Sequence, residues 1–433
     1  MKHYLTKDNL RELRSFLILW ATQALSSLGS AMTSFALIVW SYDQQGSALS
    51  TALLSVCSYL PYVAMSIFAG ALSDRWNKKR TMLVCDCIAA ATTLCVLLLL
   101  VTDRLTIGHL YAINAVNGLM NTVQRPAADV TVTLLTPKHL YQQTAALQSF
   151  SGSLINIITP ALASALLAFT GLRGVILVDL LTFAAAFLSL LLLVEIPEAE
   201  DKAVKGEPLL RAAGEGLAYL RRNRGVLHMI LSFAAINLVA SMYEAALPAM
   251  ILSVPGGGQA ALGTVNAAKG IAMLAGSSLA LLLPKPRSRV TMVVLCMAVS
   301  MSTDNFLLAF GRSLPWWCLG AVLGWLPIPL MNANLTALMR GYIPVGMQGR
   351  VFSARNTLQF FTIPVGYALG GWLVDRVFEP AMAAVQAGSL PALLFGTGKG
   401  SGAAALFAVL GACGVAVCMA MATDQRIREM ERT

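Results

Sequence analysis

Apolar segments of about twenty residues recur along the whole chain, and they constrain its fold more than any other feature. Each segment is long enough to cross about 30 Å of hydrocarbon as an α-helix. Only 12% of the 433 residues are charged, which is about half the share in an average soluble domain. Because the bilayer core holds no water, backbone groups must bond within each segment, and this requirement favours helices. We therefore expect an all-α integral membrane protein.

The apolar segments divide into twelve predicted transmembrane helices. An even number places both termini on one side of the membrane. Lys and Arg favour cytoplasmic loops, and 25 of the 31 basic residues lie on the side of the termini, against five on the other side. We therefore predict cytoplasmic termini in the plasma membrane of a bacterium. The spans are expected near residues 14–40, 50–73, 81–102, 107–124, 141–170, 174–194, 225–251, 260–283, 290–310, 315–339, 351–373 and 402–423.

The longest predicted cytoplasmic connection divides the chain into two groups of six spans. It covers residues 195–224, is rich in charge and contains an amphipathic stretch. Residues 1–194 and 225–433 would then form two pseudo-symmetric six-helix halves. A faint internal repeat relates residue 81 onward (TMLV) to residue 291 onward (TMVV), and the same offset aligns Asp74 with Pro284. The second half therefore has no counterpart of this acid.

Charge and motif content exclude several classes of protein. The net charge of +10 lies mainly in loops between the spans, where the anionic membrane surface accounts for it better than nucleic acid does. The histidines do not cluster, and no catalytic triad, phosphate-binding loop or metal-ligand spacing is present. We expect no enzymatic activity, no metal, no cofactor and no nucleic-acid partner.

The loop between the second and third spans carries the densest charge in the chain. Residues 70–80 read GALSDRWNKKR, and five of these eleven residues are charged. The glycine would allow close helix packing, the acid could face a helix N-terminus, and the basic residues could face anionic lipid. The residues alone leave two interpretations open, a gate and a plain topology anchor. The gating candidates are Gly70, Asp74, Arg75, Lys79 and Arg80.

Ionisable residues inside predicted spans are expensive and therefore informative. Glu244 in the seventh span and Lys269 in the eighth lie at matching depths of roughly 12 to 13 Å from the outer end, at about 1.5 Å per residue. We expect them to face each other, either as a static ion pair or as a substrate or proton site. Asp179 and Asp304 are second candidates for a proton site.

Polar uncharged residues form stripes on the first and fourth predicted spans and recur on the seventh and tenth. Such residues either line a cavity or hold helices together by hydrogen bonds. The residues alone leave both interpretations open. The candidates for cavity-lining residues are Gln23, Asn114, Asn117, Asn237 and Asn332.

The run at residues 70–80 matches Gly-x-Leu-x-Asp-Arg-x-x-x-(Arg/Lys)-(Arg/Lys), and through it the chain resembles the major facilitator superfamily of transporters. Residues 20–26 (WATQALS), 60–62 (LPY) and 349–353 (GRVFS) are similar to the macrolide-efflux and siderophore-export branch of bacterial drug transporters. The resemblance implies that the loop closes the cytoplasmic side. It also implies that the first, fourth, seventh and tenth spans line a central cavity.

Two further features bear on this resemblance. Arg350 and Arg355, at the start of the eleventh span, are expected contacts between the halves on the cytoplasmic side. Drug–proton antiporters of the family usually carry Gly-Pro-x-x-Gly-Gly in the fifth span. Here residues 158–163 (ITPALA) keep the proline and lack the glycines. Proton antiport is thus implied by the overall resemblance and not by this motif.

We predict a monomeric secondary active transporter that exports amphipathic organic molecules, of drug or secondary-metabolite type, by proton-driven alternating access across the lipid bilayer. One alternative is an importer or exchanger of an organic anion, with Lys269 as its charge partner. An alternative of another class is a membrane scaffold or sensor that transports nothing.

Overall fold

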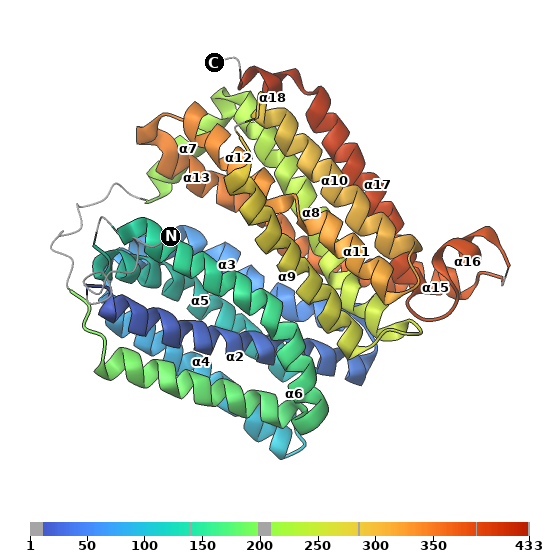
Figure 1. Ribbon diagram of the computed structural model, residues 1–433, viewed down its shortest axis with the longest axis horizontal. Helices are drawn as coiled ribbons and strands as arrows, with labels where there is room; N and C mark the ends of the chain where they lie inside the picture. The colour runs from blue at the N-terminus through green and yellow to red at the C-terminus, as the bar shows by residue number, and fades with distance from the viewer. Residues whose placement is uncertain (1–11, 138–139, 198–208, 285, 387, 432–433) are drawn as a thin grey trace. The chain divides into compact units, whose positions relative to one another are not determined.

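The computed structural model describes residues 12–137, 140–197, 209–284, 286–386 and 388–431, and within these ranges the chain is helical with short connections (Figure 1). No β-strand occurs in this part of the chain. The chain divides into two compact units, one made of Met1–Leu37 and Cys57–Gly206, the other of Ile38–Val56 and Glu207–Thr433. Helices α2 (Arg14–Gln45) and α3 (Ala48–Arg75) therefore contribute residues to both units.

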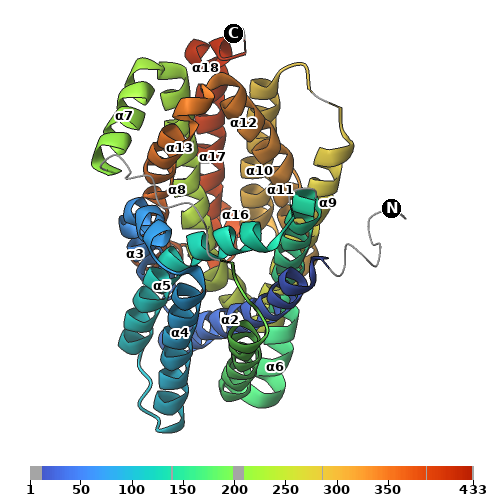
Figure 2. The same ribbon diagram turned by 90° about the vertical axis from the view of Figure 1, so that its left-hand side faces the viewer.

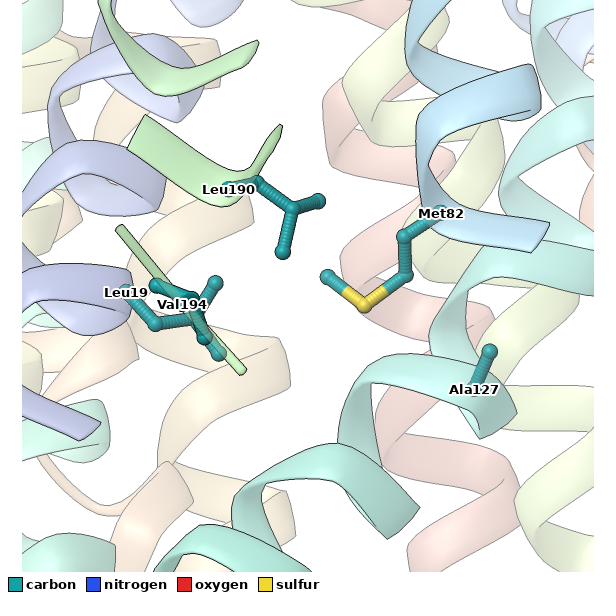
Figure 3. Close-up of a cluster of buried hydrophobic side chains, with 5 residues drawn as sticks. All are labelled: Leu19, Met82, Ala127, Leu190 and Val194. Atoms are coloured by element: carbon teal, nitrogen blue, oxygen red, sulfur yellow. The ribbon is translucent and has the colours of Figure 1, made fainter. Parts of the chain in front are cut away.

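The first unit is built mainly from three further helices, α4 (Lys78–Val101), α5 (Ile107–Leu135) and α6 (Tyr141–Leu192), and α4 packs against both of the others. Helix α6 breaks at Gly171, whose φ of 67° suits a residue without a side chain. The break falls in the gap between the fifth and sixth predicted spans. A buried cluster joins α2, α4, α5 and the end of α6 (Figure 3), and it contains Leu19, Met82, Ala127, Leu190 and Val194.

The second unit has a core of long helices that pack along their lengths. Helix α8 (Arg224–Ser253) contacts α14 (Thr362–Leu373) and α17 (Ser401–Thr423), and α10 (Arg289–Phe310) contacts α17 and α11 (Leu314–Trp325) (Figure 2). The remaining elements are α7 (Leu209–Arg222), α9 (Gln259–Leu282), α12 (Ile328–Tyr342), α13 (Val345–Phe360), the π-helix η2 (Val374–Phe378), α15 (Glu379–Ala383), α16 (Leu390–Phe395) and α18 (Gln425–Glu429).

Small residues set the spacing of the long helices in this unit. A Cβ atom at Gly370 of α14 would lie 2.6 Å from the Cα atom of Met242 in α8. Lipid is as apolar as the side chains, so helices in a bilayer are held by close packing more than by the hydrophobic effect. Glycine at this contact therefore contributes to stability by letting two backbones touch.

Nine helical stretches among the described residues are long and apolar enough to cross a membrane. One of them, within α6, covers the fifth and sixth predicted spans together. Helices α5 and α9, which correspond to the fourth and eighth predicted spans, fall outside this set in their described residues. The prediction of an all-helical, multi-span membrane protein is confirmed.

Two predicted spans differ from the structure because each is interrupted. The tenth, expected at 315–339, is split into α11 and α12, and the split falls at Leu326 and Pro327. Proline has no N–H group and its ring clashes with the preceding turn, so it breaks the helix there. The eleventh, expected at 351–373, is split into α13 and α14 at Phe361 and continues into η2.

Candidate functional site

Charged and aromatic side chains from α8, α9, α10 and α11 meet inside the second unit. The Lys269 ammonium of α9 donates a hydrogen bond of 2.8 Å to Oε1 of Glu244 in α8. This is the pair expected from the matching depths of the two residues. Consecutive antiparallel helices of similar length bring equal depths side by side, so the sequence was sufficient to predict the contact.

The environment of Lys269 is aromatic as well as acidic. Its ammonium lies 4.8 Å from the ring centroid of Tyr243 and 5.1 Å from that of Trp325, distances at which the ring quadrupole attracts a cation. Lys269 is only 6% exposed, whereas the Glu244 side chain is 32% exposed. Glu244 is therefore the accessible member of the pair, and Lys269 is enclosed.

A second carboxylate lies behind the same two rings. Asp304 of α10 is 5% exposed and accepts hydrogen bonds of 3.0 Å from the Tyr243 hydroxyl and from Nε1 of Trp325, one on each carboxylate oxygen. Both rings thus touch the lysine with their faces and the aspartate with their polar atoms. Glu244, Lys269, Asp304, Tyr243 and Trp325 are called the charged cluster below.

Close backbone packing positions this cluster. A side chain at Gly324 of α11 would collide with Cβ of Asp304, so glycine lets α11 approach α10 closely enough for the next residue, Trp325, to reach the carboxylate. Helix α11 ends at Trp325, and a side chain at Gly276 of α9 would collide with the carbonyl oxygen of Leu326 in the interruption. Interrupted helices at membrane depth occur where backbone is buried in protein or lines a cavity.

The buried acids of the first unit have partners of a different kind. Asp179 of α6 is 4% exposed and accepts a hydrogen bond of 3.0 Å from the Ser30 hydroxyl of α2. Asp86 of α4 accepts one from the Gln124 amide of α5. Both partners are neutral. Asp304, predicted alongside Asp179, is also bonded by neutral groups, but those groups face the lysine of the charged cluster, and this places Asp304 and not Asp179 in the cluster.

Three of the five candidates for cavity-lining residues interact with a neighbouring helix, and a cavity-lining role for the five stays a prediction. Asn117 accepts a hydrogen bond of 2.9 Å from Thr92 of α4, and Asn237 donates one of 3.1 Å to the Gln359 carbonyl of α13. Asn114 bonds back to the Leu110 carbonyl within its own helix. Of the remaining two cavity candidates, Gln23 of α2 interacts with the carboxylate of Asp86 in α4, and Asn332 is exposed.

The structure describes part of the charged loop at residues 70–80. Asn77 caps α4 by accepting a hydrogen bond from the backbone N–H of Arg80, whose side chain is exposed. Lys79 donates to the carbonyls of Leu191 and Val194 at 3.1 and 2.7 Å, where a cation stabilises the end of α6. Gly70, Asp74 and Arg75 belong to the last turns of α3, and the surroundings of Gly70 and the side chains of Asp74 and Arg75 lie outside what the structure describes.

The two arginines predicted at the start of the eleventh span belong to α13. Nε of Arg355 donates a hydrogen bond of 2.9 Å to Oε1 of Gln359, four residues along the same helix. The side chain of Arg350 lies outside the described residues. Their predicted role as contacts between the halves stays a prediction.

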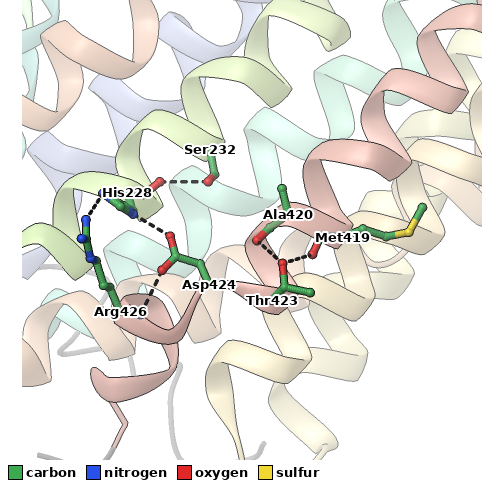
Figure 4. Close-up of polar contacts among 7 residues, drawn as sticks. All are labelled: His228, Ser232, Met419, Ala420, Thr423, Asp424 and Arg426. Carbon is green, nitrogen blue, oxygen red and sulfur yellow. Dashed lines mark hydrogen bonds and ion pairs between the residues drawn. The ribbon is translucent and has the colours of Figure 1, made fainter.

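A separate polar contact lies where α8 begins and α17 ends (Figure 4). Asp424 contacts Nδ1 of His228 at 2.6 Å and accepts a hydrogen bond of 2.9 Å from the backbone N–H of Arg426. Burial pushes the pKa of Asp424 upward, but the hydrogen bonds from His228 and Arg426 outweigh it and hold the pKa below its ordinary value. This contact fastens the C-terminal segment to α8.

Tyr243 and Trp325 were not predicted from the sequence. An aromatic residue inside an apolar span is typical of helix packing or of a lipid-facing surface, so neither stood out. The available signals were the adjacency of Tyr243 to Glu244 and the position of Trp325 two residues before a proline in the middle of a span. Among the described residues no group of three or more His, Cys, Asp or Glu side chains could hold a metal ion.

Two known proteins are similar to this chain over most of its length. The chain is 25% identical over 366 residues to macrolide efflux protein A of Streptococcus pyogenes, covering 84% of this chain and 90% of that one. It is 24% identical over 391 residues to an uncharacterised transporter, YfiS, of Bacillus subtilis (strain 168), covering 86% and 89%.

Solved structures show the same fold at low identity. The nucleoside transporter NupG matches with a TM-score of 0.69 at 14% identity, over 96% of this chain and 99% of that one. A bacterial homologue of the iron transporter ferroportin in the inward-facing state matches with a TM-score of 0.68, also at 14% identity, over 95% and 99%. These matches confirm the predicted fold. The model of the Major Facilitator Superfamily matches residues 19–367, so the chain belongs to this superfamily and is a membrane transporter, not an enzyme.

Proposed function

We propose that this protein is a secondary active exporter that moves amphipathic organic molecules out of the cell in exchange for protons. The halves at residues 1–194 and 225–433 would open the substrate path to each side in turn, with both termini in the cytoplasm. The observation that carries the proposal is the charged cluster, in which Glu244 pairs with Lys269 and Asp304 is bonded by the two aromatic side chains that also face this lysine. The name of the Streptococcus relative, a macrolide efflux protein, supports export as the direction.

The charges of the cluster account for an exchange. With Glu244 and Asp304 ionised and Lys269 protonated, the cluster has one net negative charge. Net charge at membrane depth is costly, so the cluster favours binding one further positive charge. A proton and a cationic group of the substrate can each supply it, and binding of one would disfavour the other because both would add positive charge to the same cluster. Alternate occupancy by the two cations would couple their movements in opposite directions.

The aromatic rings link the accessible acid to the enclosed one. Protonation of Glu244 removes the ion pair that holds Lys269 at 2.8 Å. Lys269 is also held by the faces of Tyr243 and Trp325, and both of these side chains donate to Asp304. A shift of the ammonium therefore changes the position or strength of the donors on Asp304. In this way a charge change at Glu244 would reach the interior of the helix bundle.

The predicted alternative, an organic-anion transporter that uses Lys269, has less support from this geometry. The ammonium already has a carboxylate partner and is covered by two rings, and Lys269 is 6% exposed. An anion would have to displace Glu244 to bind there. Glu244, whose side chain is 32% exposed, is the member of the pair that a cationic molecule would meet first.

The test is transport in proteoliposomes with an imposed pH gradient, using macrolides and amphipathic cationic dyes as probes. We expect Glu244→Gln to lower gradient-driven uptake at least about tenfold, equivalent to about 1.4 kcal/mol in the rate-limiting barrier, and to remove its dependence on the gradient. The exposed acid Glu429, replaced by Gln, is the matched control and should leave transport unchanged. Full gradient-driven transport by Glu244→Gln would overturn the proposal. Transport of organic anions that only Lys269→Met abolishes would favour the alternative.

A further inference from the structure

A carboxylate from late in the chain caps a helix that begins early in it. Asp375, in η2, accepts three hydrogen bonds from the start of α3: one of 2.6 Å from the Ser47 hydroxyl and two of 3.0 and 2.9 Å from the backbone N–H groups of Ala48 and Leu49. The first N–H groups of a helix have no partners within the helix and carry partial positive charge. Asp375 satisfies them, although it lies more than 300 residues away in sequence.

The backbones touch beside this cap. A Cβ atom at Gly371, four residues before Asp375, would lie 2.6 Å from Cα of Leu49 and 3.0 Å from the carbonyl oxygen of Ala48. Any larger residue at position 371 would push α3 away from α14. Glycine here and the carboxylate at Asp375 thus act on the same contact, one by permitting approach and the other by binding the helix end.

The end of α2 is fastened to the same unit. The Tyr42 hydroxyl donates a hydrogen bond of 3.1 Å to the Ala249 carbonyl of α8 and shares a hydrogen bond of 2.6 Å with the Ser253 hydroxyl. Its ring lies 5.5 Å from the Lys399 ammonium. These contacts explain why residues 38–56 group with residues 207–433, while the rest of α2 and α3 belongs to the first unit.

A second carboxylate in the same segment also caps a helix, but the helix it caps is α17, which follows it in the second half. Glu379, four residues after Asp375, accepts hydrogen bonds of 3.0 and 3.3 Å from the backbone N–H groups of Gly400 and Ala403 at the start of α17. This cap joins two neighbouring elements of the second half. The glycine-rich loop at 396–402 therefore offers its N–H groups to a carboxylate of the same chain.

We propose that Asp375 is a releasable latch, which holds the connection between the first two spans against the second half and lets it go once in each transport cycle. The latch lies where α17 begins, at the end opposite the C-terminus, and the predicted topology places this end outside the cell. Closed, it would seal the outer end. Opened, it would give the substrate path access to the exterior. Glu379 is fixed throughout, because both of its partners belong to one half.

The proposal rests on membership of a transporter family and on the predicted orientation. It does not depend on which ion or substrate is carried. Opening requires that the N–H groups of Ala48 and Leu49 and the carboxylate of Asp375 be hydrated together, which is feasible at an end that faces water. Loss of the carboxylate should therefore favour the open state.

The first experiment measures exposure of the outer end and requires no substrate. Ser253→Cys is labelled with a membrane-impermeant maleimide in intact cells, and labelling of the native cysteines is subtracted with the parent protein. We expect Asp375→Asn to raise the labelling rate roughly three- to tenfold, since it weakens hydrogen bonds to a charged group. Glu379→Gln, the matched control, should leave the rate unchanged. An unchanged rate in Asp375→Asn, or an equal rise in both variants, would overturn the latch.

The second experiment closes the latch with a reversible cross-link. Because the same protein is measured before and after reduction, a loss of transport caused by misfolding can be recognised. Ser47→Cys with Asp375→Cys is treated with a short thiol–thiol cross-linker that a reducing agent cleaves, because the two native side chains meet at 2.6 Å. We expect cross-linking to abolish transport and reduction to restore the rate of the untreated double variant. Transport at an undiminished rate by the cross-linked protein would show that this contact never opens. Failure of Glu244→Gln to alter coupling would leave both results unaffected, so the two proposals fail separately.

Discussion

The acids inside the long helices of the two units are held in different ways. In the first unit, Asp179 and Asp86 are paired with a serine hydroxyl and a glutamine amide, which are neutral. In the second, Glu244 pairs with Lys269, and Asp304 shares two aromatic side chains with the same lysine. A carboxylate with neutral partners can take up a proton without leaving an opposite charge exposed. A carboxylate paired with lysine cannot, so its protonation must move something.

This difference assigns separate roles to the units. The acids of the first unit act as hydrogen-bond acceptors that join α2 to α6 and α4 to α5. Under the proposed function, the acids of the second unit form a set whose members depend on one another's charge. The following predictions test whether that contrast is real, from the largest expected effect to the smallest.

Lys269→Met is expected to have the largest effect. It leaves the carboxylate of Glu244 without its cation and Asp304 close to a second uncompensated acid, and removing one member of a buried ion pair costs about 3 to 5 kcal/mol. We expect a large fall in the thermal unfolding midpoint in detergent and complete loss of transport.

The companion double variant shows whether the cost arises from charge. Adding Glu244→Gln to Lys269→Met removes the orphaned carboxylate, and we expect it to restore at least half of the lost stability. Equal stability of the single and double variants would mean that the ion pair contributes nothing, and the contrast between the units would then be lost.

The matched substitutions Asp304→Asn and Asp179→Asn compare the units directly. An asparagine at 304 can keep its oxygen on Trp325, which only donates, and place its amide against the Tyr243 hydroxyl, which can accept, so two hydrogen bonds to a charged group become neutral ones and we expect a loss of about 1.5 kcal/mol. At 179 the Ser30 hydroxyl can rotate to accept instead of donate, so the loss should be about 0.5 kcal/mol or less. The readout is the free energy of unfolding in detergent. Equal losses at both positions would contradict the distinction between the two kinds of acid.

Features that depend on residues close together in the sequence could be predicted from it, and contacts between residues far apart in the sequence could not. Apolar runs predict helices because backbone bonding in lipid is local to each segment. The pairing of Glu244 with Lys269 followed from depth in two consecutive helices. The breaks in the tenth and eleventh spans were missed because the apolar pattern continues across Pro327 and Phe361. The cap of α3 by Asp375 links residues with no periodic relationship, and no local signal predicts it.

Trp325→Phe separates the two contacts of one ring. Phenylalanine keeps an aromatic face toward Lys269 but removes the N–H group that donates to Asp304, and we expect a loss of about 1.5 kcal/mol, since hydrogen bonds to charged groups are the stronger kind.

Trp317→Phe is the control for Trp325→Phe. The Trp317 indole donates to the neutral carbonyl of Gly311 at 2.9 Å, so its loss should be nearer 1 kcal/mol. Both variants remove the same ring atoms, and Trp317 is fully buried whereas Trp325 is partly exposed, so packing alone would make Trp317→Phe the costlier change. A larger loss in Trp325→Phe would therefore support a strong hydrogen bond to Asp304, and a smaller loss would contradict it.

The smallest expected effect concerns Asp424, an acid at the water-exposed end of α17 whose partner is a histidine (Figure 4). Asp424→Asn keeps a good helix-capping residue and removes only the charge, so we expect a loss of about 0.5 kcal/mol at pH 7, typical of an exposed pair. Because the pKa of Asp424 is lowered in the folded protein, its contribution is fully present above the unfolded value of about 3.9 and is lost as the pH falls through the folded value. The difference in unfolding free energy between the variant and the parent should therefore stay constant from pH 7 down to about 4 and shrink below it.

Ser232→Ala is the control for Asp424→Asn. It removes a hydroxyl that bonds the His228 carbonyl, and its effect on stability should not change with pH. If the stability difference between Asp424→Asn and the parent persists undiminished at pH 3, the charge of this acid contributes nothing to stability. The contrast between neutral and charged partners would then apply only to the acids inside the helices.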